Sequence, residues 1–394
     1  MRLTRIALFA RHYSVYDYSM LRGLATGFMA AGTETVFLPR LLNADELRGF
    51  CATYRPDAVL EINRNRADAE GLPDAVRHIA WIQDPPHHRA GQDLGCASDL
   101  NYFMTCPDAI GYAPGRAERW GLLFTGIDTR FAFPGEQAAG SDFSIIGFLP
   151  PPVGTHELYG EPCPGTALRF GEIFDAYAER YWAAMTHGPQ PPVSHAQVMA
   201  LFDDCLRGLT GHDLAGLRLE PDTRRQVEFA VITLISRSPA RRALADTVLR
   251  VSGSLRIYGN ADWQKWPAYA PYYRGYLDGP SAVCDVLRGT RLNLHNNMNG
   301  FSMHSRVLDS MACGRPILVE SSPFDTAECG IARHFEPWVH YLPFTFDTLE
   351  GVARQWLEDE AGRRRMGQAA ARAVQDGHTW RDRARQIQRD YESL

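Results

Sequence analysis

The stretch MHSRVLDSMACGRPILVE, residues 303–320, joins an amphipathic helix pattern directly to a buried strand pattern. Gly314 and Pro316 are typical of a helix end, and the apolar run 317–319 that follows is typical of a strand inside a parallel sheet. The first turns of this helix are polar, which a helix that only supports a buried strand does not need. Because unpaired N–H groups and the dipole of a helix start favour anions, the polar start predicts a ligand site.

Strand and helix patterns alternate on both sides of this stretch. Such alternation predicts mostly parallel, doubly wound sheets, here as two Rossmann-like halves in tandem. The expected strands are 5–10, 35–39, 57–63, 78–84, 100–106 and 121–127 in the first half, and 143–149, 255–260, 272–277, 290–296, 315–320 and 339–344 in the second.

A chain of 394 residues suits two domains of ordinary size. We expect an N-terminal Rossmann-like domain over 1–135 and a C-terminal one over 143–375, with a helical insertion at about 150–250. A closing helix over 376–394 is expected to pack back towards the first domain. Ligands of such sheets bind at the carboxyl ends of the strands, so the two domains are predicted to face a central cleft.

Composition narrows the classes of function. The formal net charge of −5 and the pI near 6.2 argue against nucleic acid as a partner. The arginine clusters at 240–245 and 362–367 are interpreted as solvated helix faces. The apolar run near the N-terminus is too short for a membrane span or a signal-peptide core, so we expect no transmembrane segment and a cytoplasmic protein.

Eight cysteines are scattered along the chain without a C-x-x-C pair, and we expect free, mostly buried thiols. They are Cys51, Cys96, Cys106, Cys163, Cys205, Cys284, Cys313 and Cys329.

An Asn-rich loop precedes the helix of the opening stretch, and we expect the helix to begin near Ser302. Its N–H groups would form a pocket for a diphosphate, to which Arg306 adds a fork of charged donors. Asp309 lies three residues beyond Arg306 on the same face, where a carboxylate can accept the two vicinal hydroxyls of a ribose. Alternatively, Arg306 and Asp309 form only an ion pair on the helix surface.

Two loops of the first half are candidates for contact with a second substrate. Asp84 ends a predicted strand, and two prolines hold His87 and His88 in the loop that follows, where a carboxylate or a neutral imidazole can act as general base. Alternatively, the Asp-Pro-Pro sequence forms a turn and these residues have no catalytic role. In the loop after the first strand, His12, Tyr13 and Asp17 face the same cleft. No acidic ligand set with metal spacing accompanies the histidines, so no metal site is predicted.

The run SRVLDSMACGRPILV resembles the donor-site signature of GT-B glycosyltransferases, in which an acidic residue precedes an Ala/Ser-Met-Ala-Cys/Ala-Gly-x-Pro helix end. Asp309 occupies the acidic position. The chain is most similar to the spore-maturation CgeB-like branch of the group 1 enzymes. Further stretches agree in order with that branch: WIQDPPHH at 81–88, LLFTGIDTRFAFP at 122–134, DFSIIGFL at 142–149, LRIYGNADW at 255–263 and DGHTWRDRARQI at 376–387.

The resemblance implies a GT-B fold and transfer of a sugar from a nucleotide-diphosphate sugar to a hydroxyl of a glycan, protein or small molecule. No Asp-x-Asp motif occurs, so a metal-independent reaction without a permanently bound cofactor is expected. The first glutamate of the common retaining signature is missing, because Phe301 stands there. The residues assigned to the donor are Gly259, Asn260, Tyr276, Leu277, His295, Asn296, Gly300, Phe301, Ser302, Ser305, Arg306 and Asp309.

Two alternatives stay open from the sequence. A nucleotide-sugar epimerase on the same two-domain architecture would be favoured by two or three carboxylates in the cleft. A non-catalytic sugar-nucleotide-binding or assembly protein would explain the missing glutamate. A dinucleotide dehydrogenase is disfavoured, because the first strand is not followed by a Gly-x-Gly-x-x-Gly fingerprint.

Overall fold

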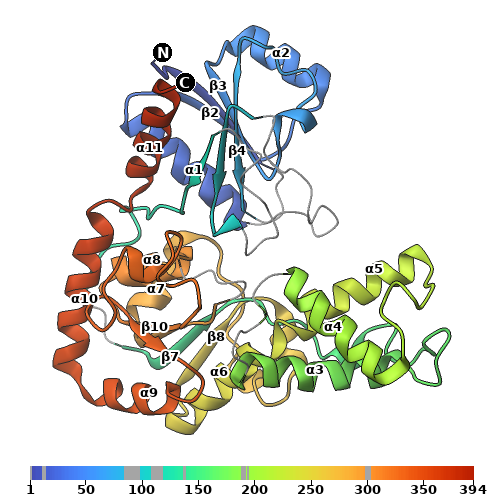
Figure 1. Ribbon diagram of the computed structural model, residues 1–394. Helices are drawn as coiled ribbons and strands as arrows, with labels where there is room; N and C mark the ends of the chain where they lie inside the picture. Colours follow the sequence, from blue (N-terminus) through green and yellow to red (C-terminus); the bar gives the residue numbers. More distant parts are fainter. Residues whose placement is uncertain are drawn as a thin grey trace.

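Two α/β lobes, each built on one parallel sheet, make up the protein (Figure 1). The computed structural model describes residues 2–10, 15–83, 98–107, 119–135, 139–187, 192, 195–297 and 303–394, without the side chains of 15–17 and 187. The two predicted Rossmann-like units in tandem are therefore confirmed as the fold class.

The first lobe holds a six-stranded sheet with the order β2-β1-β3-β4-β5-β6, in which every pair is parallel. All five residues of β3 are buried, as expected for a central strand covered on both faces. The strands are β1 Arg5–Phe9, β2 Glu34–Leu38, β3 Ala58–Ile62, β4 Arg77–Ile82, β5 Leu100–Phe103 and β6 Trp120–Leu122; the helices are α1 Val15–Ala30 and α2 Ala44–Tyr54.

The second lobe holds a five-stranded parallel sheet with the order β11-β10-β9-β7-β8. The strand order reverses at β7, which lies between β8 and β9, and the carboxyl ends at such a reversal form a crevice for ligands. The strands are β7 Ser141–Ile146, β8 Leu255–Tyr258, β9 Thr290–His295, β10 Ile317–Glu320 and β11 Leu342–Phe344; the helices are α6 Ser238–Val251, α7 Pro280–Arg288, α8 Ser305–Ala312, α9 Leu349–Glu358 and α10 Glu360–Gln375.

The strand expected at 272–277 is absent, and that prediction was wrong. Tyr273 makes only an isolated parallel bridge with Ile257 at the edge of the sheet. Gly275 then takes a φ of 108°, which no strand residue adopts, and turns the chain away from β8. Short 3-10 helices occur at Arg66–Asp68, Val153–Thr155, Ala261–Lys265, Ala270–Tyr272 and Ile331–Arg333.

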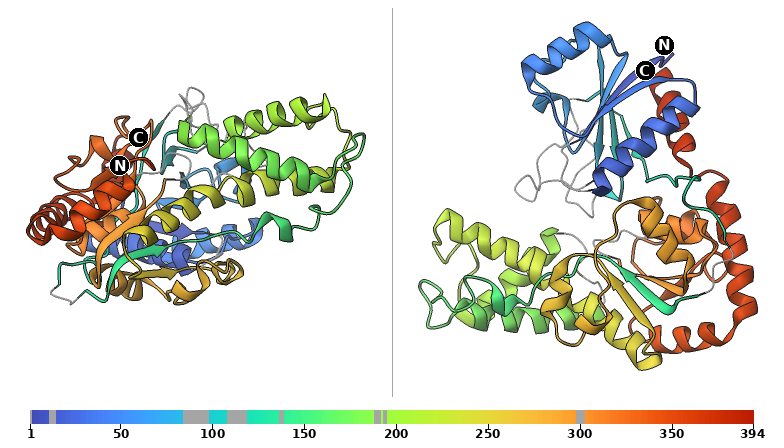
Figure 2. Two further views of the ribbon diagram at one scale, coloured as in Figure 1. Left: turned by 90° about the horizontal axis from the view of Figure 1, so that it is seen from below. Right: turned by 180° about the vertical axis from the view of Figure 1, so that it is seen from behind.

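A helical insertion separates β7 from α6 and projects sideways from the second sheet (Figures 1 and 2). It has a core of its own, in which Phe174, Tyr177, Phe202 and Val231 are buried. Its last part is a π-helix that leads directly into α6. The insertion comprises α3 Phe170–His187, α4 His195–Thr210, α5 Pro221–Phe229 and the π-helix Ala230–Ile235.

The last helix, α11 Trp380–Glu392, returns to the first lobe and lies along α1, so the two chain ends lie close together (Figure 1). Trp380 meets Trp81 edge to face, with ring centroids 6.3 Å apart. The hydroxyl of Tyr102 on β5 donates to Asp390 at 2.6 Å. The exact domain boundaries expected from the sequence stay a prediction.

Two of the cysteines depart from the expectation of free thiols. Cys106, just after β5, and Cys329, after β10, form a disulfide with a Cα–Cα distance of 5.4 Å. A scattered cysteine pattern does not reveal this pair, because the two residues are separated by 223 positions and meet only where the lobes touch. Cys51, Cys163, Cys205, Cys284 and Cys313 are free and buried, and Cys96 lies outside the described residues.

Candidate active site

A cavity of about 500 Å³ lies where the carboxyl ends of the two sheets face each other. The second lobe contributes residues that follow β7 and β8 and the start of α8. The first lobe contributes Ser19 and the segment after β6. The lining includes Gly147, Gly259, Asn260, Tyr276, Leu277, Ser305, Arg306 and Asp309 from the second lobe, and Ser19, Thr125, Gly126, Asp128 and Trp380 from the other side.

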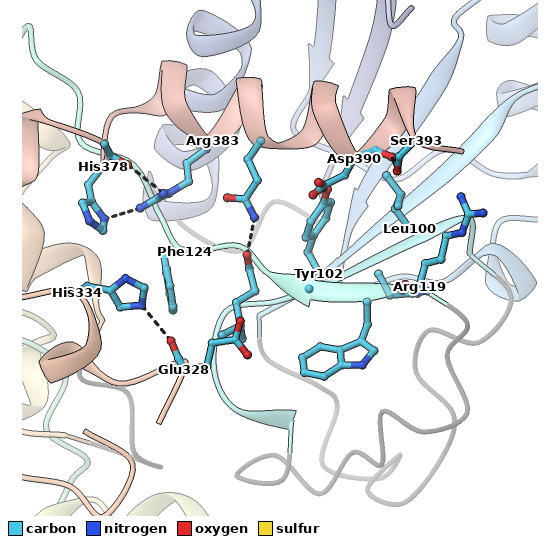
Figure 3. Close-up of a pocket in the computed structure, with 16 residues that line it drawn as sticks. Leu100, Tyr102, Arg119, Phe124, Glu328, His334, His378, Arg383, Asp390 and Ser393 are labelled. Carbon is cyan, nitrogen blue, oxygen red and sulfur yellow. Dashed lines mark hydrogen bonds between the residues drawn. The ribbon is translucent and has the colours of Figure 1, made fainter. Parts of the chain in front are cut away.

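A larger hollow of about 770 Å³ lies beside β5, β6 and α11 (Figure 3). Its polar groups are largely used to hold the chain together. Arg383 meets His378 at 2.7 Å, His334 bonds the carbonyl of Glu328 at 3.0 Å, and Gln386 donates to the carbonyl of Leu122 at 2.8 Å. These contacts tie α11 and its approach to the end of the first lobe, so we take the 500 Å³ cavity as the candidate site.

Helix α8 begins at Ser305 and not near Ser302. His304 is its N-cap residue, with an extended backbone, and its Nδ1 accepts from the N–H of Arg306 at 3.2 Å. Burial, reinforced by the charge of Arg306, holds the pKa of His304 well below its usual range, so the ring is neutral and able to accept. The difference from the sequence prediction arises because histidine is not among the usual N-cap residues.

Arg306 lies on the first turn of α8 and lines the cavity. Its Nη1 donates to the carbonyl of Ile146 at the end of β7, and its Nη2 lies 3.3 Å from Nε2 of His304. These contacts fix the guanidinium across the gap between β7 and α8. A cation held in this way is available to an anion in the cavity without further ordering of its side chain.

Asp309 lies one turn further along α8, half-buried in the cavity wall. Burial, together with the negative charge of Asp128, raises the pKa of Asp309 to about 7, although the charge of Arg306 opposes the shift. Asp128 itself is held by Arg130, whose Nε and Nη2 donate at 2.8 and 2.5 Å. The cavity therefore contains one carboxylate near its titration point at neutral pH.

This titration gives a testable pH dependence. Since the folded-state pKa of Asp309 is about 7 against an ordinary 3.8, its proton contributes stability that is complete below pH 3.8 and lost as pH rises through about 7. Relative to Asp309→Asn, the wild type should therefore lose thermal stability between about pH 5 and about pH 8.5. Melting temperatures across this range test it, with the exposed Asp376→Asn as control; parallel curves for wild type and Asp309→Asn would contradict the assignment.

Gly259 and Asn260 close the wall between the ends of β7 and β8. Gly259 has a φ of 149°, and its N–H donates to the carbonyl of Gly275 at 3.0 Å. The amide of Asn260 accepts from the N–H of Leu149 and donates to its carbonyl, both at 2.9 Å. This pair of residues therefore fixes the chain after β7 as well as lining the cavity.

The remaining predicted donor residues divide into three groups. Tyr276 and Leu277 line the cavity, and Tyr276 is exposed. His295 and Asn296 are buried at the end of β9, and they stand behind the cavity wall: the ring of His295 lies 5.1 Å from that of His304. Gly300, Phe301 and Ser302 lie outside the described residues.

The predicted acceptor side is only partly described. Asp84, His87, His88, His12 and Tyr13 lie outside the described residues, and Asp17 belongs to α1 with its side chain undescribed.

Sequence reasoning missed the contribution of the chain after β6. Thr125, Gly126 and Asp128 all line the cavity. Thr125 is fully buried, and its Oγ1 has no hydrogen-bond partner among the described residues. The motif LLFTGID was visible in the sequence, but nothing local in it indicates which of its side chains turn towards the second lobe.

Neither a metal-ligand cluster nor a membrane-spanning helix occurs among the described residues. In the part of the chain that the structure describes, no group of three or more His, Cys, Asp or Glu side chains is arranged to hold a metal ion. No described helix has both the length and the apolar character needed to cross a bilayer. Metal independence stays a prediction.

Two Rossmann-like lobes that face a shared cavity, with a helix start and a carboxylate from the second lobe in its wall, define the GT-B class of fold. Residues 237–389, from the start of α6 into α11, match the family described as glycosyl transferase-like. The chain therefore has the GT-B fold, and most of its second lobe matches a glycosyl transferase-like family. The CgeB-like branch within it stays a prediction.

Solved structures with the same architecture are distant in sequence. Anabaena HepE in complex with UDP and glucose aligns over 100% of both chains with a TM-score of 0.54 and 9% identity. Sucrose-phosphate synthase of Thermosynechococcus elongatus aligns over 99% of both chains with a TM-score of 0.51 and 12% identity. AviGT4, a glycosyltransferase of avilamycin A biosynthesis, aligns over 100% of this chain and 98% of its own length, with a TM-score of 0.50 and 12% identity. At these identities the likeness establishes the fold alone. No protein of curated function matches the chain.

Proposed function

We propose that the protein binds a nucleoside-diphosphate sugar in the cavity between the lobes and transfers its glycosyl group to a hydroxyl acceptor. The observation that carries the proposal is the convergence of Gly259, Ser305, Arg306 and Asp309 on one cavity. These groups come from one strand end and one helix start. Together they offer the positive end of a helix dipole, a fixed cation and a carboxylate, which suits a diphosphate joined to a ribose.

In this proposal each group has a role. Arg306 and the positive end of the α8 dipole stabilise the negative charge that develops on the leaving diphosphate, and they do so without a metal ion. Asp309 accepts the ribose hydroxyls. The acceptor hydroxyl enters from the first lobe, where Asp84, His87 and His88 are the predicted candidates for a general base.

Binding of nucleotides is the first test. We would screen UDP, GDP, dTDP, CMP and ADP by thermal shift, and then follow release of free nucleotide from the matching sugar donors with hydroxyl acceptors. HepE has been crystallised with UDP-glucose, which makes UDP the first probe. A shift with one nucleoside diphosphate, followed by acceptor-dependent release of that nucleotide, is the expected result. No shift with any of the five would overturn the donor site proposed here.

An epimerase is the second candidate, because the cavity holds two carboxylates, Asp128 and Asp309, and the sequence alone pointed mainly to Asp84. Against it, both carboxylate oxygens of Asp128 already accept from Nε and Nη2 of Arg130. Product analysis separates the two reactions. A transferase releases nucleotide and forms a glycoside, whereas an epimerase equilibrates two nucleotide sugars in the absence of any acceptor.

A further inference from the structure

The turn after β7 has an unusual set of hydrogen bonds. Five consecutive carbonyl groups, from residue 146 to residue 150, each accept from a side chain that belongs to another part of the second lobe. The pairs are Ile146 with Arg306, Gly147 with Trp263 at 2.8 Å, Phe148 with Arg241, Leu149 with Asn260 at 2.9 Å, and Pro150 with Trp266 at 3.0 Å.

These bonds determine which sign of charge the turn presents. Gly147 and Phe148 line the cavity, whereas Arg241 does not, so the carbonyl of Phe148 is directed into the protein. A carbonyl oxygen that pointed into the cavity would repel a phosphate. The N–H groups of Gly147 and Leu149 already donate to the carbonyl of Tyr258 and to Asn260. A carbonyl that is turned inward and capped by a donor therefore leaves the cavity side of the turn to the nearby cations.

Two of the five donors are arginines, and they converge on Gly147. A Cβ atom built on Gly147 would lie 2.8 Å from Nη1 of Arg241 and 2.8 Å from Nη1 of Arg306. A glycine is therefore needed here for both guanidinium groups to reach the turn. Two positive charges are brought together at one end of the cavity, an arrangement that a bound anion would stabilise.

Arg241 is buried and held in this position by hydrogen bonds. It lies on α6, at the end of the helical insertion, and is 4% exposed. Its Nε donates to Oδ1 of Asn296 at 3.0 Å, which sets the plane of the guanidinium. Burial, and then the charges of Arg306 and Arg237, lower the pKa of Arg241 to about 9. The direction of this change means that the folded protein holds the charge of Arg241 at a cost that an anion nearby would reduce.

The side chain of Asn296 supports the same interpretation. It is 4% exposed, and its Nδ2 has no hydrogen-bond partner among the described residues. The amide is thus oriented by Arg241 through its oxygen, at the end of β9. Asn296, which was assigned to the donor from the sequence, therefore lies behind the cavity wall and contacts Arg241 there.

We propose that Arg241 is a positioning residue for the donor diphosphate: it turns the Phe148 carbonyl out of the cavity and, with Arg306, makes the 146–150 turn a wall that accepts anions. The inference rests on the proposed function. It also gives the end of the helical insertion a role in donor binding.

The test uses the full-length protein and Arg241→Gln, with Arg242→Gln as a matched control. Arg242 is the next residue of the same helix, is exposed and stacks on Trp266 at 4.5 Å. Calorimetric titrations with UDP, inorganic pyrophosphate and uridine separate phosphate binding from nucleoside binding. In Arg241→Gln the affinity for UDP and pyrophosphate should fall about tenfold or more, because the Phe148 carbonyl is no longer held out of the cavity and a nearby positive charge is lost, with uridine changed less than about twofold. Arg242→Gln should behave as wild type.

Arg241→Lys keeps the charge but cannot bond Asn296 and Phe148 with one rigid fork, so UDP affinity should be intermediate. This variant decides the question if Arg241→Gln does not fold. Equal losses for UDP and uridine in the folded variants would reduce Arg241 to a structural role and overturn the inference. Unchanged UDP binding would overturn it as well and leave the donor site intact. A wild type that binds neither UDP nor pyrophosphate would instead overturn the proposed function itself.

Discussion

Replacing Gly259 with alanine should abolish nucleoside-diphosphate binding and lower the melting temperature. Gly259 has a φ of 149°, a region that L side chains rarely adopt. A Cβ at this position would overlap the carbonyl oxygen of Gly147, which is backbone and cannot rotate away, and would also contact Nε1 of Trp263 at 3.4 Å. Backbone strain and overpacking together predict a loss of about 3 kcal/mol or more in the free energy of unfolding.

The damage would fall on the wall of the cavity, because Gly147 and Gly259 are the residues directly beyond β7 and β8. Gly253→Ala is the matched control, since Gly253 stands just before β8 and its added Cβ would meet no atom within 4 Å. Melting curves and UDP titrations of the two variants test the prediction. A Gly259→Ala protein with the stability and UDP affinity of the Gly253→Ala protein would show that the two turns can separate without loss.

The strands of both sheets could be predicted because their apolar runs are local and continuous. Ala58–Ile62 is buried at every position, and its sequence alone carries that information. The run 272–277 has the aromatic residues typical of a strand, yet it forms only a single bridge, at Tyr273, before Gly275 takes a φ of 108°. Aromatic content predicts a half-buried surface but does not fix the backbone path.

The candidate site was predictable where its residues share one short motif. Arg306 and Asp309 lie three residues apart on α8, and the helical period places them on one face of the helix. Arg241 was not predictable in the same way. The cluster at 240–245 was interpreted as a solvated face, which holds for exposed Arg242 and is wrong for Arg241 at 4% exposure. Its burial depends on β7 and β9, which lie far away in the sequence.

The disulfide and Thr125 illustrate the same limit. Cys106 and Cys329 lie on different lobes, and no spacing rule connects them. Thr125 enters the cavity because the chain after β6 passes between the lobes on its way to β7. Contacts between lobes depend on how two folded units meet, and a pattern of propensities within one segment carries no information about that.

Replacing Arg306 with alanine should weaken UDP binding and leave uridine binding nearly unchanged. The guanidinium is fixed between the carbonyl of Ile146 and the ring of His304, and it lines the cavity beside the start of α8. Loss of one charge-assisted contact to a phosphate costs roughly 1.5–3 kcal/mol, or about 10- to 150-fold in affinity. Asp309→Ala should instead weaken UDP and uridine by similar factors, because both ligands carry the ribose.

Comparing UDP and uridine affinity in Arg306→Ala and Asp309→Ala therefore separates a phosphate contact from a ribose contact. Arg364→Ala, which removes an exposed arginine paired with Glu360 on α10, controls for the change in net charge. If Arg306 contacts the diphosphate and Asp309 the ribose, the ratio of UDP to uridine affinity falls in the first variant and stays constant in the second. A constant ratio in both would mean that Arg306 supports the turn after β7 without contacting phosphate, and the diphosphate would then have to be held mainly by the positive end of the α8 dipole.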